Sequence, residues 1–244
     1  MAKLNPVFSG IRVEEGIETA ASVKGVAGKT LLLLALAVIS AITSITVGAP
    51  YIAENPMILF VVAIGALVCG ILGQVSPNAA KVASVIYAIC EGVLLGLVSF
   101  AFDIMVGGIV MTAVLLTATI FGVMLFLYST NVIKVTSRFL RAMSAIGITI
   151  LIMSLFYFIS SIVSPGNMLI MAFTNNTGLV LLMSAFILLY GAFMLAVDFE
   201  QVNVIVANGF DKKYEWTAAL GLMVTIVWIY LEVLRLLAII SNRD

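Results

Sequence analysis

The sequence predicts an all-α integral membrane protein with seven transmembrane helices. Two observations lead to this fold class. First, 63% of the 244 residues are hydrophobic and 10% are charged, whereas a soluble domain is typically about 45–50% apolar and about 25% charged. Second, the apolar residues form runs long enough to cross a bilayer, which takes about 20 helical residues for roughly 30 Å of hydrocarbon. An ordinary water-soluble domain is therefore excluded.

Seven such runs follow one another, and residues typical of turns separate most of them. Only Asp103 interrupts the region between the third and fourth runs, but one helix there would be about twice as long as a crossing needs. The predicted spans are residues 30–49, 56–75, 82–102, 104–128, 142–163, 178–197 and 217–240. They form a transmembrane domain over residues 30–240, preceded by a cytoplasmic segment, 1–29, and followed by a short tail, 241–244.

The distribution of Lys and Arg predicts the orientation, because cytoplasmic loops carry an excess of basic residues. Ten of these residues fall on the side of the N-terminus and two on the opposite side. We therefore predict a multi-pass protein of the cell (plasma or inner) membrane with a cytoplasmic N-terminus and an external C-terminus. The ten are Lys3, Arg12, Lys24, Lys29, Lys81, Lys134, Arg138, Arg141, Lys212 and Lys213, and the two are Arg235 and Arg243.

The composition argues against several functional classes. The chain has no His, which removes the commonest neutral metal ligand and the commonest general base. Cys69 and Cys90 both lie inside apolar runs, so they indicate neither a disulfide framework nor a thiolate metal site. The net charge is zero, which leaves no electrostatic footprint for nucleic acid. We expect no enzyme activity, no cofactor and no nucleic-acid partner.

Ionisable residues inside the spans are the candidates for function, because a charge near the bilayer centre costs about 2.5–3.5 kcal/mol. Glu91 lies in the third span, roughly 14 Å from its cytoplasmic end at 1.5 Å per residue. No Lys or Arg shares this span, so Glu91 must face water, meet a partner on another helix, or be protonated. The structural alternative is a neutral Glu that hydrogen-bonds between helices.

Asp198 ends the apolar part of the sixth span, and apolar residues resume after it until Asn208. The helix must therefore tilt, break or project beyond the membrane. The last two spans form an antiparallel hairpin that turns at residues 209–213, which places Asp198 level with Thr225 and, by depth, with Glu91. A cluster of the two carboxylates and the Thr225 hydroxyl is geometrically possible and would titrate as a pair. The alternative is a boundary carboxylate solvated by headgroups.

Glu232 lies about 27 Å along the last helix, toward its outer end. Arg235 follows three residues later and is within reach as an ion-pair partner. Such a pair near a helix end is most often an anchor with a snorkelling Arg. Glu232 also lies two turns beyond Thr225 on the same face, so it would be the outer carboxylate if that face lines a pore.

Four segments resemble a bacterial branch of the Bax inhibitor-like (transmembrane Bax inhibitor motif) family of seven-helix membrane proteins. They are Glu91-Gly92, residues 134–140, residues 198–202 and the end of the last helix, 230–237. The resemblance implies six helices around a central seventh and a pH-sensitive calcium leak. It also implies a pair of aspartates, one on each of the last two helices, that share a proton.

The first of these aspartates corresponds to Asp198, but Thr225 occupies the second position. The family's basic residue on the second helix has no counterpart, since that span contains no Lys or Arg. Either Glu91 or Glu232 supplies the second carboxylate, or this chain has lost the gating chemistry.

The leading hypothesis is a pH-sensitive calcium (cation) leak channel or exchanger, whose partners are calcium ions, protons and the lipid bilayer. Asp198, Glu91, Thr225 and Glu232 would line its path, with Asp198 and Glu91 as calcium contacts, because calcium takes hard oxygen ligands. The alternative is a non-conducting regulatory protein that binds a membrane protease or another membrane protein in stress survival. Its N-terminal acidic patch would then serve for docking.

Overall fold

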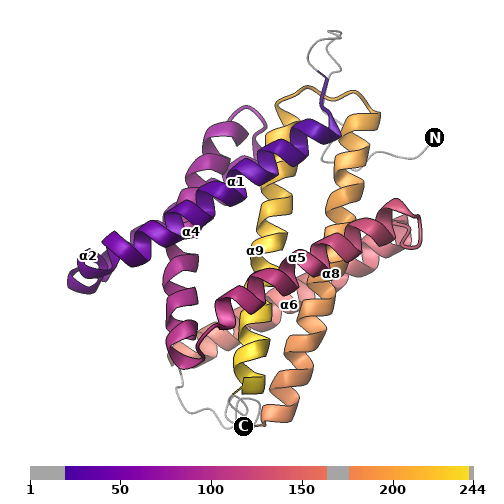
Figure 1. The fold of residues 1–244 in the computed structure, drawn as a ribbon. Coiled ribbons are helices and arrows are strands. Elements are labelled where there is room, and N and C mark those ends of the chain that lie inside the picture. The colour runs from indigo at the N-terminus through magenta and orange to yellow at the C-terminus, as the bar shows by residue number, and fades with distance from the viewer. Residues whose placement is uncertain (1–19, 164–175, 242–244) are drawn as a thin grey trace.

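The computed structural model describes residues 20–163 and 176–241, so the predicted acidic docking patch lies outside the described residues. Seven helices within these ranges are long and apolar enough to cross a membrane, which confirms the predicted fold class (Figure 1). The helices are α1 (Val23–Thr43), continued by a π-helical turn, η2 (Ser44–Gly48), then α2 (Ala49–Glu54), α3 (Met57–Val75), α4 (Ala80–Met105), α5 (Ile109–Ser129), α6 (Ser137–Val163), α8 (Thr177–Ala207) and α9 (Tyr214–Ser241).

The first helix begins at Val23, before the predicted start at residue 30. Ser22 explains the early start, because its backbone is extended and its hydroxyl oxygen accepts a hydrogen bond from Gly25 N at 3.0 Å. A serine at this position satisfies one of the N–H groups that a helix start leaves without a partner. The first turns of α1 therefore contain Lys24 and Lys29.

The boundary between the third and fourth spans lies a few residues later than predicted. Asp103 belongs to α4, which continues to Met105, and α5 begins at Ile109. Gly108 has φ +79° in the intervening turn, a conformation that favours glycine. The Asp103 carboxylate accepts a hydrogen bond from Gly108 N at 3.0 Å, so it fastens the turn from the last part of the helix.

Helix α8 is continuous from Thr177 to Ala207, so a break at Asp198 is excluded among the three predicted alternatives. Its 31 residues extend over about 46 Å at 1.5 Å per residue, which is longer than the roughly 30 Å hydrocarbon core. The helix must therefore tilt or project. It ends where the sequence predicts, at Asn208 and Gly209, and Gly209 has φ +63°.

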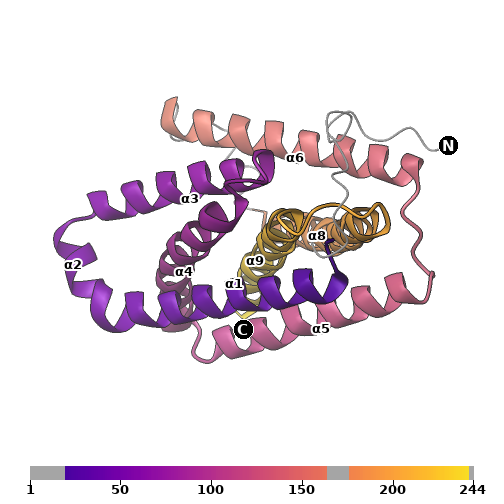
Figure 2. The ribbon, with the colours of Figure 1, turned by 90° about the horizontal axis from the view of Figure 1, so that it is seen from above.

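Helix α9 is the centre of the bundle and packs against α1, α3, α4, α5 and α8 (Figure 2). Leu220, Met223 and Leu234 on this helix are fully buried. The predicted central position of the C-terminal helix is therefore found. Helix α6 differs from the prediction, since it packs chiefly against α8, where the Tyr190 hydroxyl donates to Met143 O at 3.1 Å.

Side-chain contacts place the basic connections at one end of the bundle. Ser22 N donates to Glu215 Oε1 at 2.7 Å, which joins the start of α1 to the start of α9. Ser84 Oγ donates to Trp216 O at 3.5 Å, so the α3–α4 turn lies at the same end. This common end contains Lys24, Lys29, Lys81, Lys212 and Lys213, and the hydrogen bond from the Tyr128 hydroxyl at the end of α5 to Glu200 near the end of α8 brings the α5–α6 connection with Lys134 toward it.

Candidate functional site beside the last helical hairpin

The α8–α9 hairpin holds Asp198 opposite Thr225. The Tyr190 and Trp228 rings pack with centroids 5.5 Å apart, which fixes the register of the two antiparallel helices. Thr225 is the polar side chain that interacts with the Asp198 carboxyl across the hairpin. This is the neighbour that counting back from the turn predicts.

The Asp198 carboxyl is buried and incompletely satisfied. The residue is 8% exposed, and its Oδ2 atom has no hydrogen-bond partner within the described residues. Leaving a buried acceptor without a partner costs about 1–3 kcal/mol, and more when the group is charged. The site is therefore suited to an added proton or cation, which would satisfy the free oxygen.

Two further residues border this carboxyl, and the sequence interpretation did not include them. A β-carbon at Gly221 would stand 4.0 Å from Asp198 Oδ1 and 3.4 Å from Gln74 Nε2, so the glycine separates an amide donor from the carboxyl. Gln74 comes from the end of α3. In the sequence, Gln74 differs from its neighbours only as a polar residue one position before the end of an apolar run.

Glu91 lies level with this site but belongs to a different environment. Helices α4 and α9 run in the same direction, because Ser84 contacts Trp216 and Ser99 Oγ lies 2.7 Å from Tyr230 Oη. Glu91, midway between the two serines, is half-buried on α4.

The structure does not bring Glu91 and Asp198 into one site. The electrostatic neighbours of Glu91 are Tyr87 and Cys90, and these two side chains pack on the α3 glycines Gly70 and Gly65. Within the described residues, no group of three or more Asp, Glu, Cys or His side chains is arranged to hold a metal ion. The possible Glu91–Asp198 cluster is therefore not observed, because neither carboxyl has the other among its electrostatic neighbours.

Glu232 forms a second buried acidic position on α9. It is 7% exposed, and its Oε1 atom has no hydrogen-bond partner in the described part of the chain. Ser184 of α8 is its neighbour across the hairpin, with a buried hydroxyl that also has no hydrogen-bond partner among the described residues, and the exposed Arg235 attracts Glu232 electrostatically, as the spacing predicts. Seven residues separate Glu232 from Thr225, which is about 10 Å along the helix.

The comparison with protein families covers almost the whole chain. A family model described as Bax inhibitor 1 like matches residues 5–242. The chain belongs to this family. No curated protein and no solved structure matches the chain significantly. In this Bax inhibitor 1-like protein, a threonine faces the buried aspartate across the hairpin.

The same Bax inhibitor 1-like chain contains a buried ion pair that joins α1 to α9. Glu215 is fully buried and forms an ion pair with Lys29, while Ser22 donates to its Oε1 atom from both the backbone N (2.7 Å) and the hydroxyl (3.2 Å). Lys29 also lies 5.2 Å from the centre of the Trp216 ring. We name Ser22, Lys29 and Glu215 the α1–α9 clasp. The sequence does not single out Glu215, because this residue follows a short connection that already contains other charged residues.

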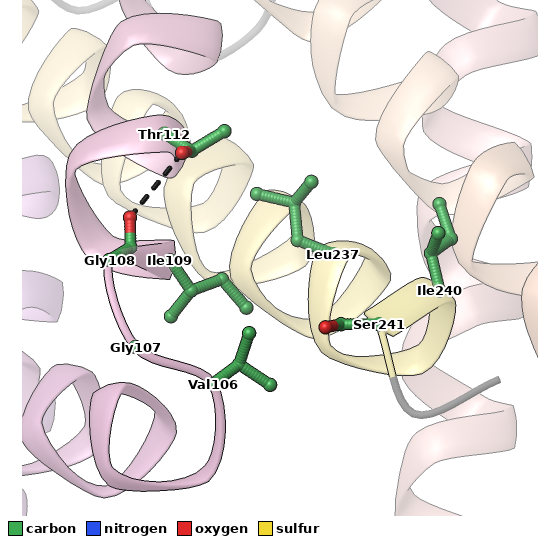
Figure 3. Close-up of a pocket in the computed structure, with 8 residues that line it drawn as sticks. All are labelled: Val106, Gly107, Gly108, Ile109, Thr112, Leu237, Ile240 and Ser241. Carbon is green, nitrogen blue, oxygen red and sulfur yellow. Dashed lines mark hydrogen bonds between the residues drawn. The ribbon is translucent and has the colours of Figure 1, made fainter. Parts of the chain in front are cut away.

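A small hollow lies at the other end of the molecule and contains none of the predicted site residues. It measures about 310 Å³ and lies between the α4–α5 turn and the last turn of α9 (Figure 3). Ile109, Leu237 and Ile240 supply apolar lining, and the Thr112 hydroxyl donates to Gly108 O at 3.3 Å. No charged side chain lines this hollow.

Proposed function

We propose that this Bax inhibitor 1-like protein is a pH-sensitive cation leak channel or exchanger that admits calcium. The observation that carries the proposal is the buried Asp198 carboxyl, which keeps one oxygen without a hydrogen-bond partner in the described structure. A charged group placed at membrane depth without a full set of partners is a functional candidate.

The chemistry around Asp198 suits exchange between a proton and a hard cation. Calcium is bound by carboxylate, carbonyl and other oxygen ligands, and Asp198 and Thr225 provide such atoms on facing helices. The proton and the cation compete for the same carboxylate oxygens. The conductance would therefore respond to pH through the protonation of Asp198.

Glu232 extends the proposed path toward the outer end of α9. Its carboxyl repeats the arrangement at Asp198, with one hydroxyl neighbour, Ser184, and one oxygen without a partner in the described ranges. Glu91 is half-buried on α4 and lies next to the proposed path. It does not share a site with Asp198. Asp198 and Glu232 would then act as successive cation positions along α9.

Calcium flux into liposomes tests the role of Asp198. With purified full-length protein and an enclosed calcium dye, Asp198→Asn is expected to lower the leak about tenfold, since losing a ligand contribution of about 1.4 kcal/mol changes an equilibrium tenfold. The same variant is expected to remove the dependence of the leak on pH. Glu54→Gln is the matched control, because Glu54 is an exposed acid at the opposite end of the bundle.

An Asp198→Asn protein that folds and leaks calcium like the wild type at every pH would refute this assignment. The non-conducting regulatory role, with a membrane protease or another protein as partner, would then be the better explanation of the family membership. Thr225→Ala serves as a second variant, with a smaller expected loss, because it removes a neighbour of the carboxyl and leaves the charge.

A further inference from the structure

A long apolar groove runs along one side of the bundle, away from the carboxyl of Asp198. It has a volume of about 1130 Å³ and is lined by α1 and α5 with α9 between them. Both walls pack against α9, and α1 also packs closely on α4 while α5 packs on α8. Figure 2 shows α1 and α5 on the same side of α9. The residues that line the groove are mostly aliphatic and aromatic, for example Leu34, Val114 and Phe121.

The walls of the groove open toward the hydrocarbon of the membrane. Val38 on α1 is 58% exposed and Val114 on α5 is 47% exposed, and both line the groove. Both belong to helices that are long and apolar enough to cross a bilayer. An apolar cleft open to hydrocarbon along its length is suited to an acyl chain.

The basic end of the groove is polar and contains both signs of charge. The Tyr128 hydroxyl donates to Glu200 Oε2 at 2.7 Å, which holds the carboxylate at the groove. Lys134 also lines this end, is exposed, and forms no ion pair within the described residues. The side chains of Asn131 and Asn203 complete the polar lining.

We propose that this groove binds one zwitterionic phospholipid of the phosphatidylethanolamine class. Its acyl chain lies in the apolar part, its ammonium group donates to Glu200, and its phosphate accepts from Lys134. The lipid sits in the leaflet at the basic end of the bundle. Glu200 and Lys134 then each meet an opposite charge, and charge-assisted hydrogen bonds of this kind are about twice as strong as neutral ones.

The charge pattern distinguishes this lipid from related ones. A choline headgroup carries no N–H and so cannot hydrogen-bond to Glu200. An anionic glycerol headgroup has no ammonium group, and the Glu200 carboxylate repels its net negative charge. The apolar groove holds the chain of any of these lipids, so the preference among headgroups comes from the polar end.

Native mass spectrometry of the full-length protein with added phosphatidylethanolamine, phosphatidylcholine or phosphatidylglycerol tests the proposal. The wild type is expected to retain one phosphatidylethanolamine about tenfold more strongly than phosphatidylcholine, the difference of one charge-assisted hydrogen bond. Glu200→Gln should abolish this preference. Lys134→Gln should weaken the retention of all three lipids. Lys81→Gln is the control, because Lys81 is an exposed lysine at the same end that does not line the groove, and it should leave the retention of each lipid unchanged.

A second pair of variants tests the acyl-chain part. Ala118→Trp, on the α5 wall, should reduce the number of retained lipids by one. Ala145→Trp, at an exposed position of α6 outside the groove, should leave it unchanged. Inorganic phosphate added at the same concentration should not displace the lipid, since it lacks both the chain and the ammonium group.

Three results would overturn the proposal. The first is equal lipid retention by the wild type, Glu200→Gln, Lys134→Gln and Ala118→Trp. The second is a dimer that Ala118→Trp dissociates, which would identify a second copy as the occupant. The third is lipid retention that appears only after deletion of residues 2–19, which would identify this segment as the occupant.

Discussion

The missing side chain of Gly221 determines what surrounds the Asp198 carboxyl. Because this position has no β-carbon, Gln74 and Asp198 approach the same point on α9 from two different helices. A methyl group there would make ordinary contacts at 3.4 and 4.0 Å, whereas a branched side chain would fill the space between the amide and the carboxyl.

We therefore expect Gly221→Ala to fold and to leak calcium like the wild type, and to be more stable by about 0.4–1 kcal/mol because alanine restricts the unfolded chain. Gly221→Val should lower the calcium leak while the protein remains folded. Thermal unfolding in detergent and liposome flux measure the two effects. Equal flux in Gly221→Val and in the wild type would show that the space beside Asp198 has no part in conduction.

The α1–α9 clasp offers a second test at the scale of single residues. Lys29→Met should lower the free energy of unfolding by about 3–5 kcal/mol, because it leaves the buried Glu215 carboxylate without its cation. The combined variant Lys29→Met with Glu215→Gln should be less destabilised, since no buried charge remains. Denaturant unfolding in detergent measures both. If the single and the combined variants unfold at the same point, the ion pair does not contribute as the structure indicates.

Acidic residues inside apolar runs could be identified as candidates from the sequence. Polar residues near the ends of helices could not. Asp198 and Glu232 stand out as acids in apolar runs, and both are buried on the last hairpin. Gln74 and Glu215 lie near helix ends, where polar residues are common. Their importance depends on side chains from other helices, which a single sequence does not place.

The crossing of α1 and α4 shows how small residues set the distance between two elements. Ser40 Oγ donates to Ile89 O at 2.7 Å, and a β-carbon at Gly92 would overlap the backbone of Ala37. Such close approach, with hydroxyl bonds between helices, is typical of small-residue packing in membranes.

Gly92→Ala should therefore lower stability by at least about 1–3 kcal/mol, because the atoms in its way belong to the backbone of α1. Gly122→Ala on α5 is the matched control, since no atom lies within 4 Å of the point where its β-carbon would stand. Thermal unfolding of the two variants in the same detergent compares them. Similar melting temperatures would contradict the close packing of α1 on α4.

Element boundaries were predicted well where turn residues mark them and less well where a side chain extends a helix. The end of α8 at Asn208-Gly209 was predicted because these residues terminate helices. The start of α1 was placed too late, since Ser22 caps a helix that begins before the apolar run. Length and hydropathy locate the part of a helix inside the membrane but not the turns that project from it.

Over the whole molecule, the segregation of charge predicts orientation. The α3–α4 and α8–α9 turns lie at one end with their lysines, and Glu54 lies toward the other. In a background of Cys69→Ser and Cys90→Ser, a membrane-impermeant maleimide should label Glu54→Cys from outside intact cells. It should reach Lys81→Cys and Lys213→Cys only after permeabilisation, because cytoplasmic loops carry the basic residues. Labelling of Lys81→Cys in intact cells would reverse the orientation.

Seven spans and a central C-terminal helix were predicted, because run length reveals the spans and the family resemblance implies six helices around the seventh. The position of α6 was not predicted. Helix α6 is attached to α8 by Tyr190, whose hydroxyl donates to Met143 O and packs closely on Gly147, and by an edge-to-face contact between the Phe139 and Phe193 rings. Nothing in the apolar sequence of α6 distinguishes a neighbour of α8 from a neighbour of α9.

Helix α9 presents different faces to the groove and to the buried acids. Ile226 and Tyr230 line the groove, while Thr225 and Glu232 face α8. If the groove holds the proposed lipid and the buried acids hold the proposed cation, α9 contacts both ligands, and whatever factor the lipid contributes to cation affinity the cation contributes equally to lipid affinity. Bilayer composition would then act as an allosteric effector of ion binding, and calcium would in turn select which lipids stay attached.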